Sequence, residues 1–92
     1  MNDTALTKLS ETMIMVAARA AHRYLDVHNC KPVSDVALAN CLRSMVKVYY
    51  PKAMADAKEA MDCGMAQIAE QTFLATMAQA GIEAAKECST PE

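Results

Sequence analysis

The sequence predicts an all-α fold, first because of its composition. Eighteen of the 92 residues are Ala and eight are Met, whereas the chain has two Gly, one Phe and no Trp. Ala and Met favour helices, so this composition argues against β-sandwiches, barrels and glycine-rich nucleotide-binding folds. A chain of this length supports one modest core, and we expect a single helical domain over residues 1–92.

The second reason is helical periodicity broken by capping signals. We expect four helices, at about 4–28, 35–50, 52–63 and 65–88, followed by a frayed tail at 89–92. Asn29 suits the left-handed position after the first helix, and Ser34 is a good N-cap for the second. Pro51 predicts a sharp bend at residues 50–52, and Gly64 ends the third helix.

The apolar residues of the first helix recur at spacings of three, four or seven. They are Leu6, Leu9, Met13, Val16, Ala20 and Val27, and Ala17 and Tyr24 widen the stripe. We expect this stripe to face the core. Met15 falls on the opposite face among charged residues, so we expect it to be exposed.

The third reason is that the later helices also carry apolar stripes. In the segment 52–63, Met54 and Met61 are predicted to point inward. The helix 65–88 has apolar residues on two sides, so it lies either at the centre of its own bundle or against a second subunit. Its small-residue stripe would mediate a homodimer and consists of Leu74, Ala78, Gly81 and Ala85. The predicted architecture is a compact antiparallel bundle of about four helices, two long and two short, with a dimer as one arrangement.

Charge and hydropathy limit the cellular setting. Residues 1–52 carry seven Lys or Arg against four Asp or Glu, whereas residues 53–92 carry two against seven. The longest apolar run has six residues, so we expect no membrane span, and no secretory signal is visible. We expect a cytoplasmic protein whose four cysteines are reduced thiols.

Local motifs give no support for catalysis. His22 and Asp26 are spaced like an exposed ion pair of one helix, and a third metal ligand is not in reach. Cys30 is the cysteine whose neighbours best suit a reactive thiol, but nucleotide-binding and hydrolase motifs do not occur in the sequence. We therefore expect no enzyme activity, no cofactor and no metal site.

Protein binding is the function that fits a small, strongly polarised chain of this kind. We expect a non-catalytic helical protein-interaction module, by class-level analogy a bacterial or phage accessory or inhibitor protein. The predicted partner contacts are Met15, Arg19, His22, Arg43, Lys47 and Tyr50. The alternative is a nucleic-acid-associated accessory protein that uses the basic faces of the first two helices.

Overall fold

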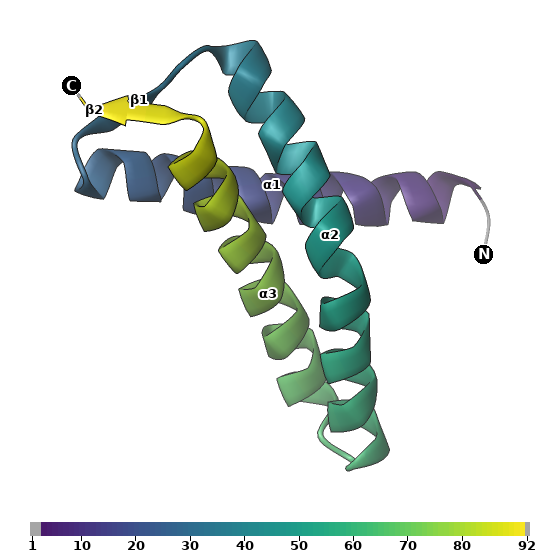
Figure 1. Ribbon diagram of the computed structural model, residues 1–92. Coiled ribbons are helices and arrows are strands. Elements are labelled where there is room, and N and C mark those ends of the chain that lie inside the picture. The colour runs from purple at the N-terminus through teal and green to yellow at the C-terminus, as the bar shows by residue number, and fades with distance from the viewer. Residues whose placement is uncertain (1–2, 92) are drawn as a thin grey trace.

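The computed structural model describes residues 3–91, with side chains from 11 to 90, and shows three helices and two short strands in that range (Figure 1). In chain order these are α1 (Asp3–Val27), β1 (Cys30–Pro32), α2 (Asp35–Asp62), α3 (Ala66–Glu87) and β2 (Ser89–Pro91). The all-α prediction is confirmed, but the prediction of four helices is wrong. The segments 35–50 and 52–63 form one helix of 28 residues.

Pro51 lies inside α2 and does not end it. A proline in a helix lacks the N–H that would bond to the carbonyl four residues earlier, here that of Lys47, and it usually costs about 3 kcal/mol. Tertiary contacts on both sides offset this cost. Tyr50 packs edge-on against Phe73 of α3, with ring centroids 6.2 Å apart, and Ala53 is buried.

The helix boundaries elsewhere follow the capping residues. Asn29 has φ 52°, which ends α1 in the left-handed region. The Ser34 hydroxyl accepts a hydrogen bond from the Ala37 N–H at 3.0 Å, as an N-cap does. Gly64 has φ 77°, and the backbone N–H groups of Gly64 and Met65 bond back to Met61 and Ala60, which is a Schellman ending.

Helices α2 and α3 lie side by side as an antiparallel hairpin, and α1 crosses this hairpin near the end where β1 and β2 pair (Figure 1). The molecule measures 45 × 27 × 17 Å, with a radius of gyration of 14.1 Å. A compact globule of 92 residues would have a radius of gyration of about 12 Å. The predicted compact bundle is therefore replaced by an open arrangement with α3 in contact with both other helices.

The crossing of α1 over α3 depends on small residues. Ala17 and Ala21 on α1, and Gly81 and Ala85 on α3, are buried. A Cβ added at Gly81 would lie 2.7 Å from the carbonyl carbon of Ala17, so the two backbones are in direct contact. Met77, the largest fully buried side chain of the described residues, lies one turn away on α3.

This close crossing rotates α1 relative to its predicted orientation. The described residues that are buried on α1 are Met13, Ala17, Ala21 and Leu25. At 100° per residue this line is displaced by roughly 80° from the predicted stripe. Val27, predicted to be inward, is 69% exposed, and Val16 and Ala20 are half-buried. Leu6 and Leu9 were also predicted to be inward, but they lie outside the range in which the structure describes side chains.

The far end of the hairpin is not covered by α1 (Figure 1). Met54 and Met61, both predicted to be inward, are exposed there, Met61 by 57%. The physical reason is that α2 and α3 cover only the sides that they present to each other. A third helix would be needed to bury the remaining apolar side chains.

The C-terminal segment 89–91 is ordered into strand β2, so the prediction that it is frayed is wrong. Strands β1 and β2 pair antiparallel, with Lys31 opposite Thr90, and the Val33 N–H donates to the Cys88 carbonyl at 2.7 Å. A disulfide joins Cys41 of α2 to Cys88, which contradicts the prediction that these two cysteines are reduced. Disulfides are rare in the cytosol, so this bond and the predicted cytoplasmic location point in opposite directions.

Candidate interaction surfaces

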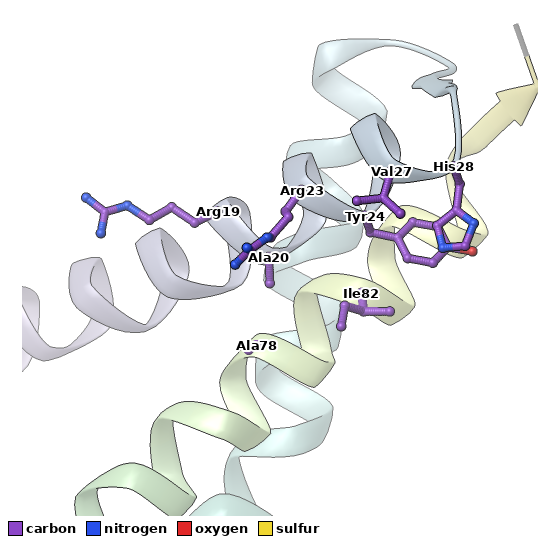
Figure 2. Close-up of a pocket in the computed structure, with 8 residues that line it drawn as sticks. All are labelled: Arg19, Ala20, Arg23, Tyr24, Val27, His28, Ala78 and Ile82. Atoms are coloured by element: carbon purple, nitrogen blue, oxygen red, sulfur yellow. The ribbon is translucent and has the colours of Figure 1, made fainter.

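A groove lies between the C-terminal half of α1 and α3, and we call it the crossing groove (Figure 2). Its volume is about 510 Å³. Eight residues line it: Arg19, Ala20, Arg23, Tyr24, Val27, His28, Ala78 and Ile82. The floor is apolar because α1 is rotated at the crossing, which leaves part of its predicted core stripe facing this groove.

Basic side chains border this apolar floor. Figure 2 shows Arg23 beside Ala20, while Arg19 extends outward from the same helix. The rings of Tyr24 and His28 lie together at the other end, with centroids 4.2 Å apart. Among the described side chains, the ion pair is that of Lys86 with Glu83 on α3. Arg19 and Arg23 are therefore not paired with a carboxylate within 4 Å in this range. The groove thus offers apolar contacts next to two cations.

A second open apolar surface lies at the turn between α2 and α3, and we call it the hairpin tip. It consists of the exposed side chains Met54, Met61, Met65 and Ile68. Gly64 to Ile68 also line a shallow pocket of about 380 Å³. Residues 54–71 contain four acidic residues and one lysine, a net charge of −3. Exposed charges of both signs lie in this segment, among them Lys58, Asp62 and Glu70.

The predicted partner contacts are distributed over two helices. Met15 is exposed as expected, by 52%, and His22 is also exposed on α1. Arg19 lines the crossing groove, whereas Arg43 and Lys47 are exposed on α2 and do not line it.

Tyr50 is half-buried, and its ring contacts Phe73 of α3. It contributes to packing of the hairpin, which restricts what it can offer to a partner. On the continuous helix α2, Tyr50 still lies on the same side as Arg43 and Lys47, at spacings of seven and three.

The predicted dimer stripe is used inside the chain. Gly81 and Ala85 are buried at the crossing with α1, and Leu74 and Ala78 are half-buried. The sequence predicts a second subunit at this stripe because helix 65–88 is apolar on two sides. In the structure α3 is the central helix, and α1 and α2 cover those sides. The stripe is therefore not free for a partner, and that argument for a dimer is removed.

The structure offers little for catalysis or metal binding in its described part. No group of three or more His, Cys, Asp or Glu side chains is placed to hold a metal ion among the described residues. Cys30 is a half-buried free thiol whose Sγ donates to the His28 carbonyl at 3.4 Å, and Cys63 is a free, exposed thiol. Over the same described range, the helices lack a stretch apolar and long enough to cross a lipid bilayer.

Several residues of these surfaces were not predicted as contacts: Arg23, Val27, His28 and Ile82 in the groove, and Met65 and Ile68 at the tip. One signal in the sequence does point to the groove residues. Ala17 and Ala21 pair in size with Gly81 and Ala85, and small residues at spacings of four allow two helices to approach closely. Placing these residues at the contact rotates the larger apolar residues of α1 outward, into the groove.

Comparison with protein-family models, with curated proteins and with solved structures finds no match to this chain.

Proposed function

We propose that this chain is a non-catalytic helical protein-interaction module and that the hairpin tip is its principal contact surface. The observation that carries the proposal is the group of four large apolar side chains left exposed where the hairpin extends beyond α1. Large apolar side chains left exposed toward one end of a small protein favour contact with another protein. Methionine suits such a site because its flexible thioether adapts to the partner's surface.

The charges around the hairpin tip indicate what kind of partner fits. Lys58 and Asp62 are exposed near Met61 on α2, so the apolar side chains of this helix have charges of both signs beside them. A complementary surface therefore has an apolar centre and charges that can pair with Lys58 and Asp62. An accessory or inhibitor protein of a bacterium or phage would act in this way, by occupying such a surface on its target.

The test combines affinity capture with methyl NMR. Wild type and the double variant Met61→Ser/Ile68→Ser are used to capture proteins from a lysate of the source organism. The variant Val36→Ser/Val48→Ser serves as the matched control, because it also removes two exposed apolar side chains and neither is a predicted partner contact. We expect the tip variant to lose at least about 90% of the captured partner and the control to retain it.

The captured partner is then titrated into protein labelled at the methionine methyl groups. Signals of Met54, Met61 and Met65 should broaden or shift, while that of buried Met77 should not. Capture that is equal for wild type and the tip variant, with unchanged tip methyl signals, would overturn the proposal.

Nucleic-acid binding is the second candidate, supported by the exposure of Arg19, Arg23, Arg43 and Lys47. If these four cations contacted phosphates, affinity for duplex DNA would fall by about 10²-fold between 50 and 200 mM salt. A fluorescence-anisotropy titration at the two salt concentrations measures this. DNA binding that is absent at low salt, or insensitive to salt, contradicts the candidate.

A further inference from the structure

The disulfide lies directly beside the paired strands. It joins Cys41, in the first half of α2, to Cys88, which is the C-cap of α3 and precedes β2. Cys88 is buried, whereas Cys41 is half-buried. The bond therefore fixes against α2 the residue from which β2 extends, and Cys41 is the more accessible of its two residues.

The pair of strands β1 and β2, which we call the clasp, has few interactions of its own. It contains three residue pairs, with Lys31 opposite Thr90 at the centre, and the Val33 N–H donates to the Cys88 carbonyl beside it. Of the β2 side chains that the structure describes, Ser89 is half-buried and Thr90 is exposed. A two-stranded ribbon of this size is not stable by itself in water, so the clasp depends on what holds Cys88 in place.

A third cysteine lies within the clasp. Cys30 begins β1, opposite Pro91, and its half-buried side chain packs against the core. Its Sγ donates to the His28 carbonyl at 3.4 Å. Separation of β2 from β1 would remove a neighbouring strand from Cys30 and raise the exposure of its thiol.

We propose that the disulfide between Cys41 and Cys88 is a redox-sensitive latch, which holds the clasp closed when oxidised and, when reduced, lets it open and expose the Cys30 thiol. This inference goes beyond the proposed function and does not depend on it, because the clasp and the hairpin tip lie at opposite ends of the hairpin (Figure 1).

The reductant of the latch is a dithiol. One of its thiolates attacks the sulfur of Cys41, the more exposed residue, and forms a mixed disulfide, while Cys88 leaves as a thiolate and takes up a proton. The second thiolate of the reductant then attacks the reductant's own sulfur in the mixed disulfide. Cys41 leaves as a thiolate and is protonated, and the reductant departs as a disulfide. The protein gains two electrons and two protons.

Opening is confined to the clasp because the helices have their own buried contacts. Met77, Ala80 and Ala84 of α3 are fully buried, and α3 contacts both other helices. Segments with few buried contacts open at lower free-energy cost than such a core. A latch of this kind is compatible with a reducing compartment, where the disulfides that do occur are mostly transient.

Amide hydrogen exchange followed by NMR tests the opening, in the presence of either oxidised or reduced dithiothreitol. Reduction should speed exchange of the Val33 N–H, which donates to the Cys88 carbonyl, by at least about tenfold. The Met65 N–H, bonded to the Ala60 carbonyl at the hairpin tip, is the matched control and should not change. In the reduced protein Val33 should also exchange faster than Met77, which separates local opening from global unfolding.

Thiol labelling with a maleimide, read by mass spectrometry, tests the exposure of Cys30. Wild type purified without reductant is compared with the variant Cys41→Ala/Cys88→Ala, which lacks the bond. Cys30 should react faster in the variant, whereas the exposed Cys63 should react at the same rate in both proteins. Circular dichroism at 222 nm checks that the variant retains its helices.

A second variant opens the clasp while the disulfide stays intact. Thr90→Pro removes the backbone N–H at the position opposite Lys31, and a proline there cannot donate to the neighbouring strand. Cys30 should again be labelled faster than in wild type. Thr90→Ser keeps the N–H and is the matched control, so its Cys30 should react at the wild-type rate. If the double alanine variant does not fold, Thr90→Pro and the exchange of Val33 decide.

Four results would overturn the proposal. They are a wild type in which Cys41 and Cys88 are not joined, Val33 exchange that reduction leaves unchanged, Val33 exchange in the reduced protein that is no faster than that of Met77, and Cys30 labelling that stays at the wild-type rate in either folded variant.

Discussion

The α1–α3 crossing and the hairpin tip use apolar residues in opposite ways. At the crossing, Gly81 lies directly against the Ala17 backbone, and the buried residues around it are mostly Ala. At the tip, larger side chains such as Met61 and Ile68 remain exposed. In this Ala- and Met-rich chain, small residues mark the closest helix contacts, and large apolar residues also occur where no helix covers them. Residue size therefore indicates burial better than hydropathy does.

The largest effect is expected from Gly81→Leu at the crossing. The added side chain would overlap the Ala17 backbone, which cannot move aside without separating α1 from α3. We expect loss of the cooperative thermal transition followed by circular dichroism at 222 nm. Ala75→Leu, at an exposed position of α3, is the matched control and should change the free energy of unfolding by less than about 0.5 kcal/mol. A variant Gly81→Leu that melts like wild type would show that the crossing is not close.

The next largest effect is expected from removing the disulfide between Cys41 and Cys88, which lies near the α1–α3 crossing. Cys41 and Cys88 are 47 residues apart, and closing a loop of this length stabilises the folded state by about 4 kcal/mol in the chain-entropy model. Cys41→Ser should lower the urea midpoint accordingly, whereas Cys63→Ser, which removes an exposed free thiol, should not. Thiol titration of the unreduced, unfolded wild type should find two free thiols. A count of four would contradict the disulfide.

How well the sequence predicts these regions depends on how far along the chain each signal acts. The caps at Asn29, Ser34 and Gly64 are local, because each acts within a few residues, and all three were predicted correctly. The prediction that Pro51 ends a helix is wrong, because tertiary contacts such as that of Tyr50 with Phe73 offset the free-energy cost of a proline inside a helix. A local signal sets the free-energy cost of a conformation, and long-range packing determines whether the folded chain adopts that conformation.

Orientation and pairing are harder to predict for the same reason. Met15 was placed correctly because it is apolar among charged neighbours of its own helix. Val27 was placed wrongly because its exposure depends on where α3 crosses α1. The pairing of residues 30–32 with 89–91 joins opposite parts of the chain, and no pattern within either segment indicates it. The exposure of the groove residues and of the tip methionines depends on the same long-range packing.

A smaller effect is expected from Gly64→Ala at the tip. Gly64 has φ 77°, but a Cβ there would meet no atom within 4 Å, so the cost is conformational and not steric. We expect a loss of about 1 kcal/mol in the free energy of unfolding, measured by urea denaturation. Gly64→Asn should cost less, because asparagine tolerates the left-handed region. Equal, large losses in both variants would indicate that the tip is more tightly packed than described.

The smallest effect is expected from Met61→Ala, also at the tip. Because Met61 is largely exposed, the free energy of unfolding should change by less than about 0.5 kcal/mol. Met77→Ala in the core is the contrasting variant and should cost about 2–5 kcal/mol. The pair is measured by urea denaturation at a concentration where the protein is monomeric. A large loss in the free energy of unfolding of Met61→Ala would mean that Met61 is buried within the single chain.

Pro51 gives α2 a property that its continuous ribbon does not show. The proline removes one backbone hydrogen bond at the junction between residues 35–50, which contain three of the four buried residues of this helix, and residues 52–62 toward the tip. Few buried contacts and a missing bond lower the cost of local opening. Amide protons of residues 52–62 should therefore exchange with deuterium faster than those of residues 38–50. Faster exchange there would show that α2, one helix in geometry, opens in two parts, and that the less stable part carries the surface proposed for binding.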